Sequence, residues 1–168
     1  GYQALTADTT GANNTATGYK ALFANTSGNN NVANGVNTLI ANTTGASNAA
    51  YGYFALSSNT TGSGNTAIGG NRVLASLTTG SNNIGIGYQV GSFGAPTTGS
   101  NNILIGTTSA VATPTAGTSN WLNIGNTIYG DMSNHLIAIG NGVTAITAGA
   151  ALDLSSNTSS LLFPIGAT

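Results

Sequence analysis

Apolar and polar positions recur along residues 1–106 with a period of seventeen residues. The phrase Gly-Tyr-x-Ala-Leu begins at Gly1, Gly18 and Gly52, with a weaker copy at Gly35, so successive copies start seventeen residues apart. A unit of this length is too short for two packed helices, and its recurring Gly and Asn residues would interrupt a helix. The period therefore predicts a repeat protein made of short strands and tight turns.

Two further columns of residues recur in the same register. A glycine follows each Thr-Thr or Thr-Ser pair, and an asparagine stands three residues after that glycine. The two columns are Gly11, Gly28, Gly45, Gly62, Gly80 and Gly99, and Asn14, Asn31, Asn48, Asn65, Asn83 and Asn102. We expect the glycines to supply the positive φ that a tight turn requires.

Two segments of each unit have the composition of short strands. One is represented by residues 65–69, Asn-Thr-Ala-Ile-Gly, and the other by residues 53–56, Tyr-Phe-Ala-Leu. Stacked units of this kind form the coils of a parallel β-solenoid, in which insertions near Gly69 and at residues 93–96 lengthen two coils. The sequence predicts an all-β protein with a β-roll of about six coils of about 17 residues over residues 1–106.

Alternation along the first strand predicts which side chains point into the coil. The inward column is Ala16, Ala33, Ala50, Ala67 and Gly85, and it ends at Leu104. Such a column suits a narrow interior with room for little more than a methyl group. The flanking columns change from Thr15 and Thr17 to Ile103 and Ile105. Because burying an Ile-rich face is favourable, we expect several chains to associate side by side.

Charge is almost absent from the chain. Two Lys or Arg and three Asp residues give a formal net charge of -1. Two separated basic residues cannot neutralise a run of phosphates, so neither nucleic acid nor an anionic membrane is an expected partner. The chain has no Cys, and none of its apolar stretches has the length of a membrane-spanning segment. No metal or other cofactor is expected.

The combination of Gly-Tyr-x-Ala-Leu with Asn-Thr-Thr-Gly-x-x-Asn-Thr-Ala-x-Gly resembles the repeats of bacteriophage tail fibres and trimeric bacterial surface adhesins. YadA-like heads and the mosaic adhesive trimer fibres of predatory bacteria are similar examples. The resemblance, which covers about residues 1–106, implies a homotrimer of parallel β-rolls, commonly wound left-handed. It also implies an extracellular protein of a bacterial surface or phage virion that attaches to a host, prey or cell-surface receptor, with glycans among the candidate ligands.

Residues 107–168 lose the period and are expected to form an irregular β cap, or a connector to a next module. Pro114 marks a loop or joint near its start, and residues 151–164 resemble segments that lead into the next module of phage fibres.

Candidate chemistry gathers in this second region. The residues are Trp121, Tyr129, Asp131, Asn134 and His135, which include the only Trp and the only His of the chain. Sugar rings stack on aromatic faces while polar side chains bond their hydroxyls, so the cluster predicts a carbohydrate site. The alternative is that Trp121 and Tyr129 are core or trimer-interface residues of a capping segment.

Three other functions are alternatives to attachment. A purely structural fibre spacer would need no ligand. The stacked Thr pairs, from Thr9-Thr10 to Thr97-Thr98, could form an ice-binding array, although neighbouring residues of a strand face opposite sides. Asp131, Ser133 and His135 are the residue types of a serine triad, but a strand would line them up side by side and a turn would scatter them, so we interpret them as a polar turn and expect no enzyme.

Overall fold

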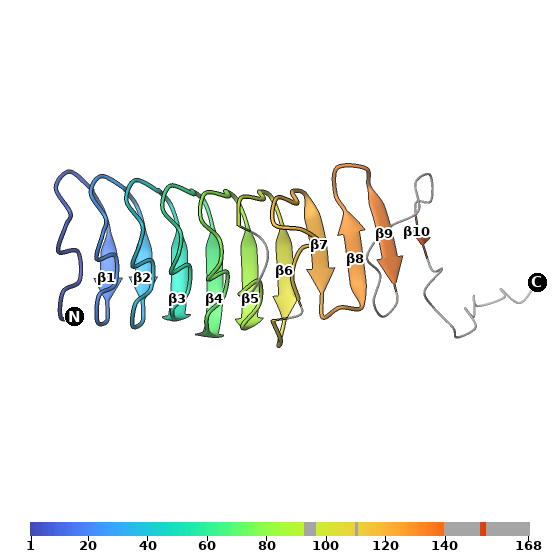
Figure 1. Ribbon diagram of the computed structural model, residues 1–168, viewed down its shortest axis with the longest axis horizontal. Helices are drawn as coiled ribbons and strands as arrows, with labels where there is room; N and C mark the ends of the chain where they lie inside the picture. The colour runs from blue at the N-terminus through green and yellow to red at the C-terminus, as the bar shows by residue number, and fades with distance from the viewer. Residues whose placement is uncertain (93–96, 110, 140–151, 154–168) are drawn as a thin grey trace, which may run out of the picture.

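The computed structural model describes residues 1–92, 97–109, 111–139 and 152–153, which form a ten-stranded sheet with the strands in chain order (Figure 1). The strands are β1 (Thr15–Thr17), β2 (Val32–Asn34), β3 (Ala49–Tyr53), β4 (Thr66–Asn71), β5 (Ile84–Tyr88), β6 (Ile103–Gly106), β7 (Trp121–Ile124), β8 (Ile128–Asp131), β9 (Leu136–Ile139) and β10 (Leu152–Asp153). These residues include no helix that could cross a membrane.

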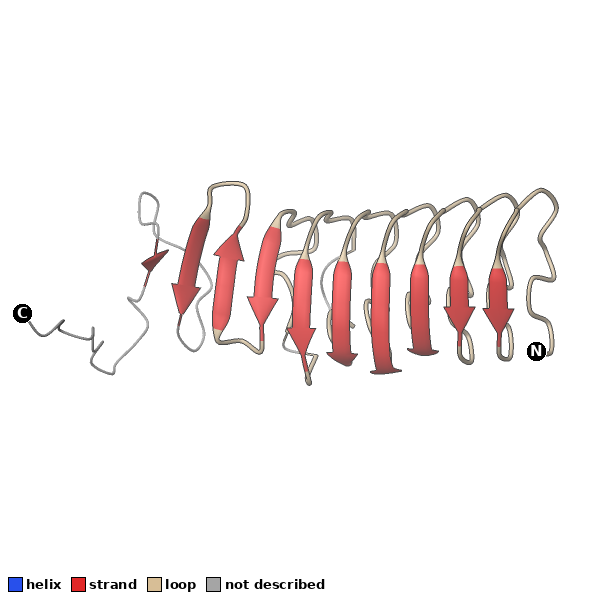
Figure 2. Ribbon diagram, turned by 180° about the vertical axis from the view of Figure 1, so that it is seen from behind, coloured by secondary structure: helices blue, strands red, loops and turns tan. Residues whose placement is uncertain are grey.

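The strands β1 to β7 pair in parallel, one from each coil, and stack along a rod (Figure 2). Their loops lie behind the sheet and return the chain from the end of one strand to the start of the next. The predicted β-solenoid is thereby confirmed. Beyond it, β7, β8 and β9 pair antiparallel, and β10 pairs in parallel with β9.

The inward column forms the narrow interior that the alternation predicts. Ala33, Ala50, Ala67 and Leu104 are completely buried. Gly85 interrupts the alanines because a Cβ at this position would lie 2.6 Å from Cγ of Leu74 and 2.9 Å from Cγ1 of Val73. Val73 stands where the preceding coil has Ala55, so its larger side chain occupies part of the space that the methyl group of an alanine fills elsewhere.

The predicted second strand at residues 53–56 is wrong. Tyr53 ends β3, and Phe54 and Leu56 have φ of 54° and 51°, in the left-handed region. Neighbouring Ala55 and Leu56 are both completely buried, whereas successive side chains of a strand would point to opposite sides. The N–H of Phe54 donates to the preceding coil and that of Leu56 to the following one. This corner is therefore bonded to both neighbours without forming a strand.

The expected role of the Thr-Thr-Gly glycines is also wrong. Positive φ occurs instead in another column of glycines. Gly52 of β3, for example, has a φ of 127° and directly follows inward-facing Ala50 and outward-facing Tyr51. Gly45 is required for a different reason. A Cβ there would lie within the contact distance of the carbonyl oxygen of Gly62 and of the Asn42 side chain. The glycine column permits close approach between the backbones of successive coils.

The asparagine column forms a buried ladder of hydrogen bonds along the rod. Nδ2 of Asn48 donates to Oδ1 of Asn31 at 3.1 Å and to the carbonyl of Gly62 at 2.9 Å. Oδ1 of Asn48 accepts from the backbone N–H and the Nδ2 of Asn65, at 2.9 and 3.1 Å. Each amide uses its donors and acceptors on neighbouring coils, so the side chain can be buried without an unpaired polar group.

A second ladder runs through Asn25, Asn42 and Asn59. Nδ2 of Asn25 donates to the carboxylate of Asp8 at 3.2 Å. At the other end, Leu77 occupies the equivalent position of the next coil, and Oδ1 of Asn59 is buried without a hydrogen-bond partner. This ladder is therefore shorter than the first.

The insertion near Gly69 is accommodated as a register shift in the sheet. Tyr51 pairs with Ile68, but Tyr53 pairs with Asn71, so β4 carries one more residue than β3 between these pairs. The predicted insertion is confirmed as a β-bulge. The second insertion, at residues 93–96, lies outside the described residues, as does most of the predicted connector at 151–164.

Candidate functional site

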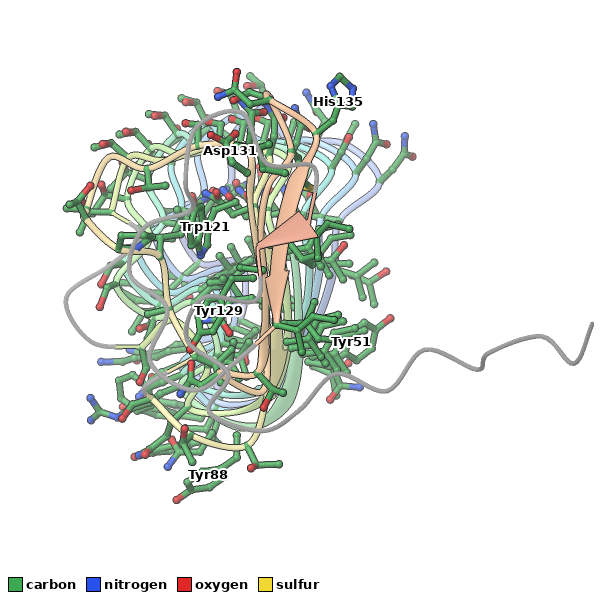
Figure 3. All side chains as sticks on the ribbon, turned by 90° about the vertical axis from the view of Figure 1, so that its right-hand side faces the viewer. Tyr51, Tyr88, Trp121, Tyr129, Asp131 and His135 are labelled. Carbon is green, nitrogen blue, oxygen red and sulfur yellow. The ribbon has the colours of Figure 1, made fainter. Side chains whose placement is uncertain are left out.

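The structure separates the five predicted site residues into a buried aromatic pair, Trp121 and Tyr129, and a polar group at the exposed end of β8 and in the turn that follows it (Figure 3). Trp121 and Tyr129 point into the solenoid, where they are only 8% and 6% exposed and their ring centroids lie 6.4 Å apart. They belong to the hydrophobic core. Their aromatic faces are consequently not presented to a surface ligand in this chain.

The polar members of the predicted set lie in the exposed turn between β8 and β9. The carboxylate of Asp131 accepts hydrogen bonds from the hydroxyl and N–H of Ser133 and from the N–H and Nδ2 of Asn134. These donors, with the Ser133 hydroxyl the most important, lower the pKa of Asp131 below its ordinary value. The Ser133 hydroxyl is thus engaged by the carboxylate, in a polar turn that holds His135 on its exposed end.

A hollow of about 290 Å³ lies beside this turn. Its lining residues are Leu122, Gly130, Asp131, Met132, His135, Leu136 and Ile137. Two residues of the predicted site, Asp131 and His135, contribute to its rim, whereas its remaining lining is almost entirely apolar. The hollow could take a small group with an apolar body, although it does not join the aromatic residues to the polar ones.

The outer face of the sheet carries an uncovered strip of aliphatic side chains, which we call the aliphatic strip. Side chains of successive strands form two adjacent columns in register, the second of which is interrupted on β8 by Gly130. The columns are Ile68, Ile86, Ile105, Ile124, Ile128 and Ile139, and Ile84, Ile103, Leu122 and Ile137. Ile68 and Ile137, near its two ends, are 42% and 43% exposed.

A second exposed surface follows the corner of the coils at the carboxyl ends of the strands. The sequence alone does not predict it, because the Tyr of Gly-Tyr-x-Ala-Leu marks the repeat without showing where its side chain lies. Tyr2 and Tyr88 are 73% and 50% exposed, and Tyr19 and Tyr53 also lie on this corner. The following position of the repeat holds both basic residues, Lys20 and Arg72. Their equal place in the repeat was the signal that could have identified this surface.

The Thr pairs have a structural role within the coils. The hydroxyl of Thr43 donates to the carbonyl of Thr60 at 3.0 Å, and the hydroxyl of Thr60 donates to Thr78 at 3.1 Å. The first hydroxyl of each of these pairs is thereby used between coils. In the pairs that begin at Thr43, Thr60 and Thr78, the first Thr is half-buried and the second is exposed.

Within the described ranges, no group of three or more His, Cys, Asp or Glu side chains is arranged to hold a metal ion. Comparison of the chain with protein-family models, with curated proteins and with solved structures gives no match. Function is therefore inferred from the aliphatic strip, the exposed corner and the repeat itself.

Proposed function

We propose that this chain is an extracellular fibre protein, a shaft or head, that forms a homotrimer and serves in attachment to a host, prey or cell surface. The observation that carries the proposal is the aliphatic strip. A contiguous exposed apolar surface on a soluble protein marks an interface, whereas isolated exposed apolar residues need no explanation. The strip extends over successive strands without a charged side chain among its residues.

The occupant of the strip is a second and a third copy of the same chain. The strip is regular, because its residues recur in register on successive strands, and two sheet faces pack against each other at about 10 Å. Three such faces meeting at one axis would form a shared core. The interior of a single coil is narrow and holds only a few Ala, Leu or Val side chains, so association between chains would add buried apolar surface.

The resemblance of the repeats to tail fibres and trimeric adhesins supports the number three and a left-handed winding. In this proposal the regular coils are the rigid shaft, since the buried asparagine ladder fixes each coil on the next. The segment from β7 onward is a β cap or connector. The exposed β8–β9 turn, with Asn134 and His135, is a candidate for contact with a glycan.

The mass of the chain in solution, measured by light scattering, tests the assembly. We expect a mass of three chains for the wild type and of one folded chain for the double variant Ile86→Asn and Ile105→Asn. The matched control is Thr17→Asn, which lies in the same outward column on a coil without the aliphatic strip. A wild-type chain that is monomeric, folded and soluble would exclude this fibre.

Screening of the trimer against an array of surface glycans tests attachment. We expect binding to at least one glycan, and the single variants His135→Ala and Asn134→Ala report whether the β8–β9 turn contributes. These residues are exposed, so their loss tests recognition without removing the buried Trp121. A trimer that binds no glycan and no cell surface would instead be a structural spacer.

A further inference from the structure

The exposed corner at the carboxyl ends of the strands combines aromatic rings with all the basic side chains of the protein. The chain has only two Lys or Arg residues. Lys20 and Arg72 occupy equivalent positions of their coils, because the N–H of Lys20 donates to the carbonyl of Tyr2 and that of Arg72 to the carbonyl of Tyr53. Both cations therefore project from one column along the rod. We call this surface the cationic corner.

Both cations are held against aromatic rings. Nζ of Lys20 lies 5.3 Å from the ring centroids of Tyr19 and Phe23. The guanidinium carbon of Arg72 lies 5.3 Å from the ring centroid of Phe54. These are cation–π distances, and they limit the freedom of two long side chains that would otherwise move in solvent. The charges are therefore presented at defined places on the surface.

Exposed tyrosines run beside the two cations. The rings of Tyr2 and Tyr19 stack with their centroids 5.8 Å apart, and Tyr53 and Tyr88 continue the same corner on later coils. Tyr side chains offer an apolar ring and a hydroxyl at one surface, which is the combination that sugar rings contact. Lys20 and Arg72 are three coils apart, or about 14 Å at a rise of about 4.8 Å per coil.

The charge on this corner is not neutralised by the carboxylates for which the structure gives contacts. Asp8 accepts from the N–H of Gly11 and from the side-chain amides of Asn14 and Asn25. Asp131 accepts from its own turn, and Figure 3 places it at the end of the coil section opposite Tyr88. The corner is thus positive although the chain has a net charge of -1.

We propose that the cationic corner binds an extended acidic polysaccharide lying along the rod. Its sugar rings would contact the tyrosines, and its carboxylate or sulfate groups would pair with Lys20 and Arg72. Two cations in about 14 Å suit a polymer with widely spaced charges, whereas a nucleic acid carries a phosphate charge about every 1.7 Å of duplex axis. This inference deepens the proposed attachment and rests on it for its biological role.

The corner stays accessible in the proposed trimer. The aliphatic strip lies on the outer face of the sheet, on the side of Tyr51 in Figure 3, while Tyr88 lies at the end of the coil section. Three corners would therefore run along each fibre. Simultaneous contact of one polymer with several of them would raise a weak affinity by avidity.

The test measures retention of the full 168-residue chain on immobilised heparin and hyaluronate, with neutral dextran as the control surface. We expect retention on at least one acidic polymer at low salt and its loss at high salt. The double variant Lys20→Met and Arg72→Met removes the charges but keeps apolar stems, and we expect a decrease of roughly tenfold in affinity. The exchange Lys20→Arg and Arg72→Lys should preserve binding.

Gln89→Met is the matched control, because Gln89 occupies the same column without a charge, and it should leave retention unchanged. Absence of retention on both acidic polymers, or equal retention of the neutralised variant, would overturn the proposal. So would binding to vesicles with anionic lipids but to neither polymer. Light scattering on the same samples reports trimer formation separately, so failure of the fibre and failure of the corner are distinguishable.

Discussion

The regular coils and the hairpin that follows them fill the interior behind the sheet with different side chains. In the coils, the inward positions hold alanines and a ladder of buried asparagines, each bonded to both neighbouring coils. In β7 the position of the ladder is taken by Trp121, whose backbone N–H still donates to Oδ1 of Asn102 at 2.8 Å. The indole offers no acceptor to a following coil.

The ladder therefore ends at Trp121, and the sheet changes from parallel to antiparallel pairing immediately afterwards. Tyr129 of β8 packs near Trp121, so two large rings fill the space that small side chains fill in the coils. The difference indicates that the ladder continues only where each inward side chain both donates to one coil and accepts from the next. A residue without a side-chain acceptor, such as Trp121, ends it.

The largest effect is expected from Trp121→Ala. Removing a buried Trp costs about 3–5 kcal/mol through lost packing and the cavity that remains. Because coils contact only their neighbours, the loss should be confined to β7–β9. Native-state hydrogen exchange should show loss of protection in β8 and β9 while β2 to β4 stay protected. Equal loss of protection in every strand would contradict this separation, and exposed Thr127→Ser serves as the control.

The next effect is expected from Asn65→Val in the regular coils. The variant leaves the N–H and Nδ2 of Asn83 without their acceptor and the carbonyl of Gly80 without its donor. Unpaired buried groups of this kind should lower the free energy of unfolding by about 2–4 kcal/mol, measured by urea denaturation. Exposed Thr79→Ser should change it by less than about 0.5 kcal/mol. Similar changes in the free energy of unfolding for the two variants would show that the ladder does not stabilise the coils.

A smaller effect is expected from Gly85→Ala, which inserts a methyl group against Val73 and Leu74. Overpacking should lower the free energy of unfolding by about 1–3 kcal/mol. The second change Val73→Ala should recover part of this loss, because it frees space beside the new methyl group. A double-mutant cycle measures the coupling, and strictly additive effects would show that the two side chains do not compete for space.

The smallest effect concerns the β8–β9 turn. Ser133→Ala removes the main hydrogen bond that lowers the pKa of Asp131, so this pKa should rise toward its ordinary value in an NMR titration. Since the folded-state pKa is lowered, the carboxylate stabilises the fold above the unfolded-state pKa. That contribution is lost as pH falls through the folded-state pKa. Asp131→Asn should therefore reduce stability slightly near neutral pH and not in acid; an effect equal at both pH values would contradict this.

Part of the candidate surface was accessible from the sequence and part was not. The Ile columns follow from strand alternation, so the need for a covering surface could be predicted from residues such as Ile103 and Ile105. The inward orientation of Trp121 and Tyr129 could not, since residue type alone fits both a sugar platform and a core. The cationic corner arises only when coils place Lys20 and Arg72 in one column.

The sequence by itself determined the period, the solenoid, the small inward column and the insertion near Gly69, because strand alternation and repeat length are local properties of the chain. Tertiary structure decided that residues 53–56 form a corner and that Gly45 serves close backbone approach. It also decided that the asparagines form a continuous buried ladder. The physical reason is common to all three. Each depends on hydrogen bonds and contacts with the coil before and the coil after, which a single unit of sequence does not contain.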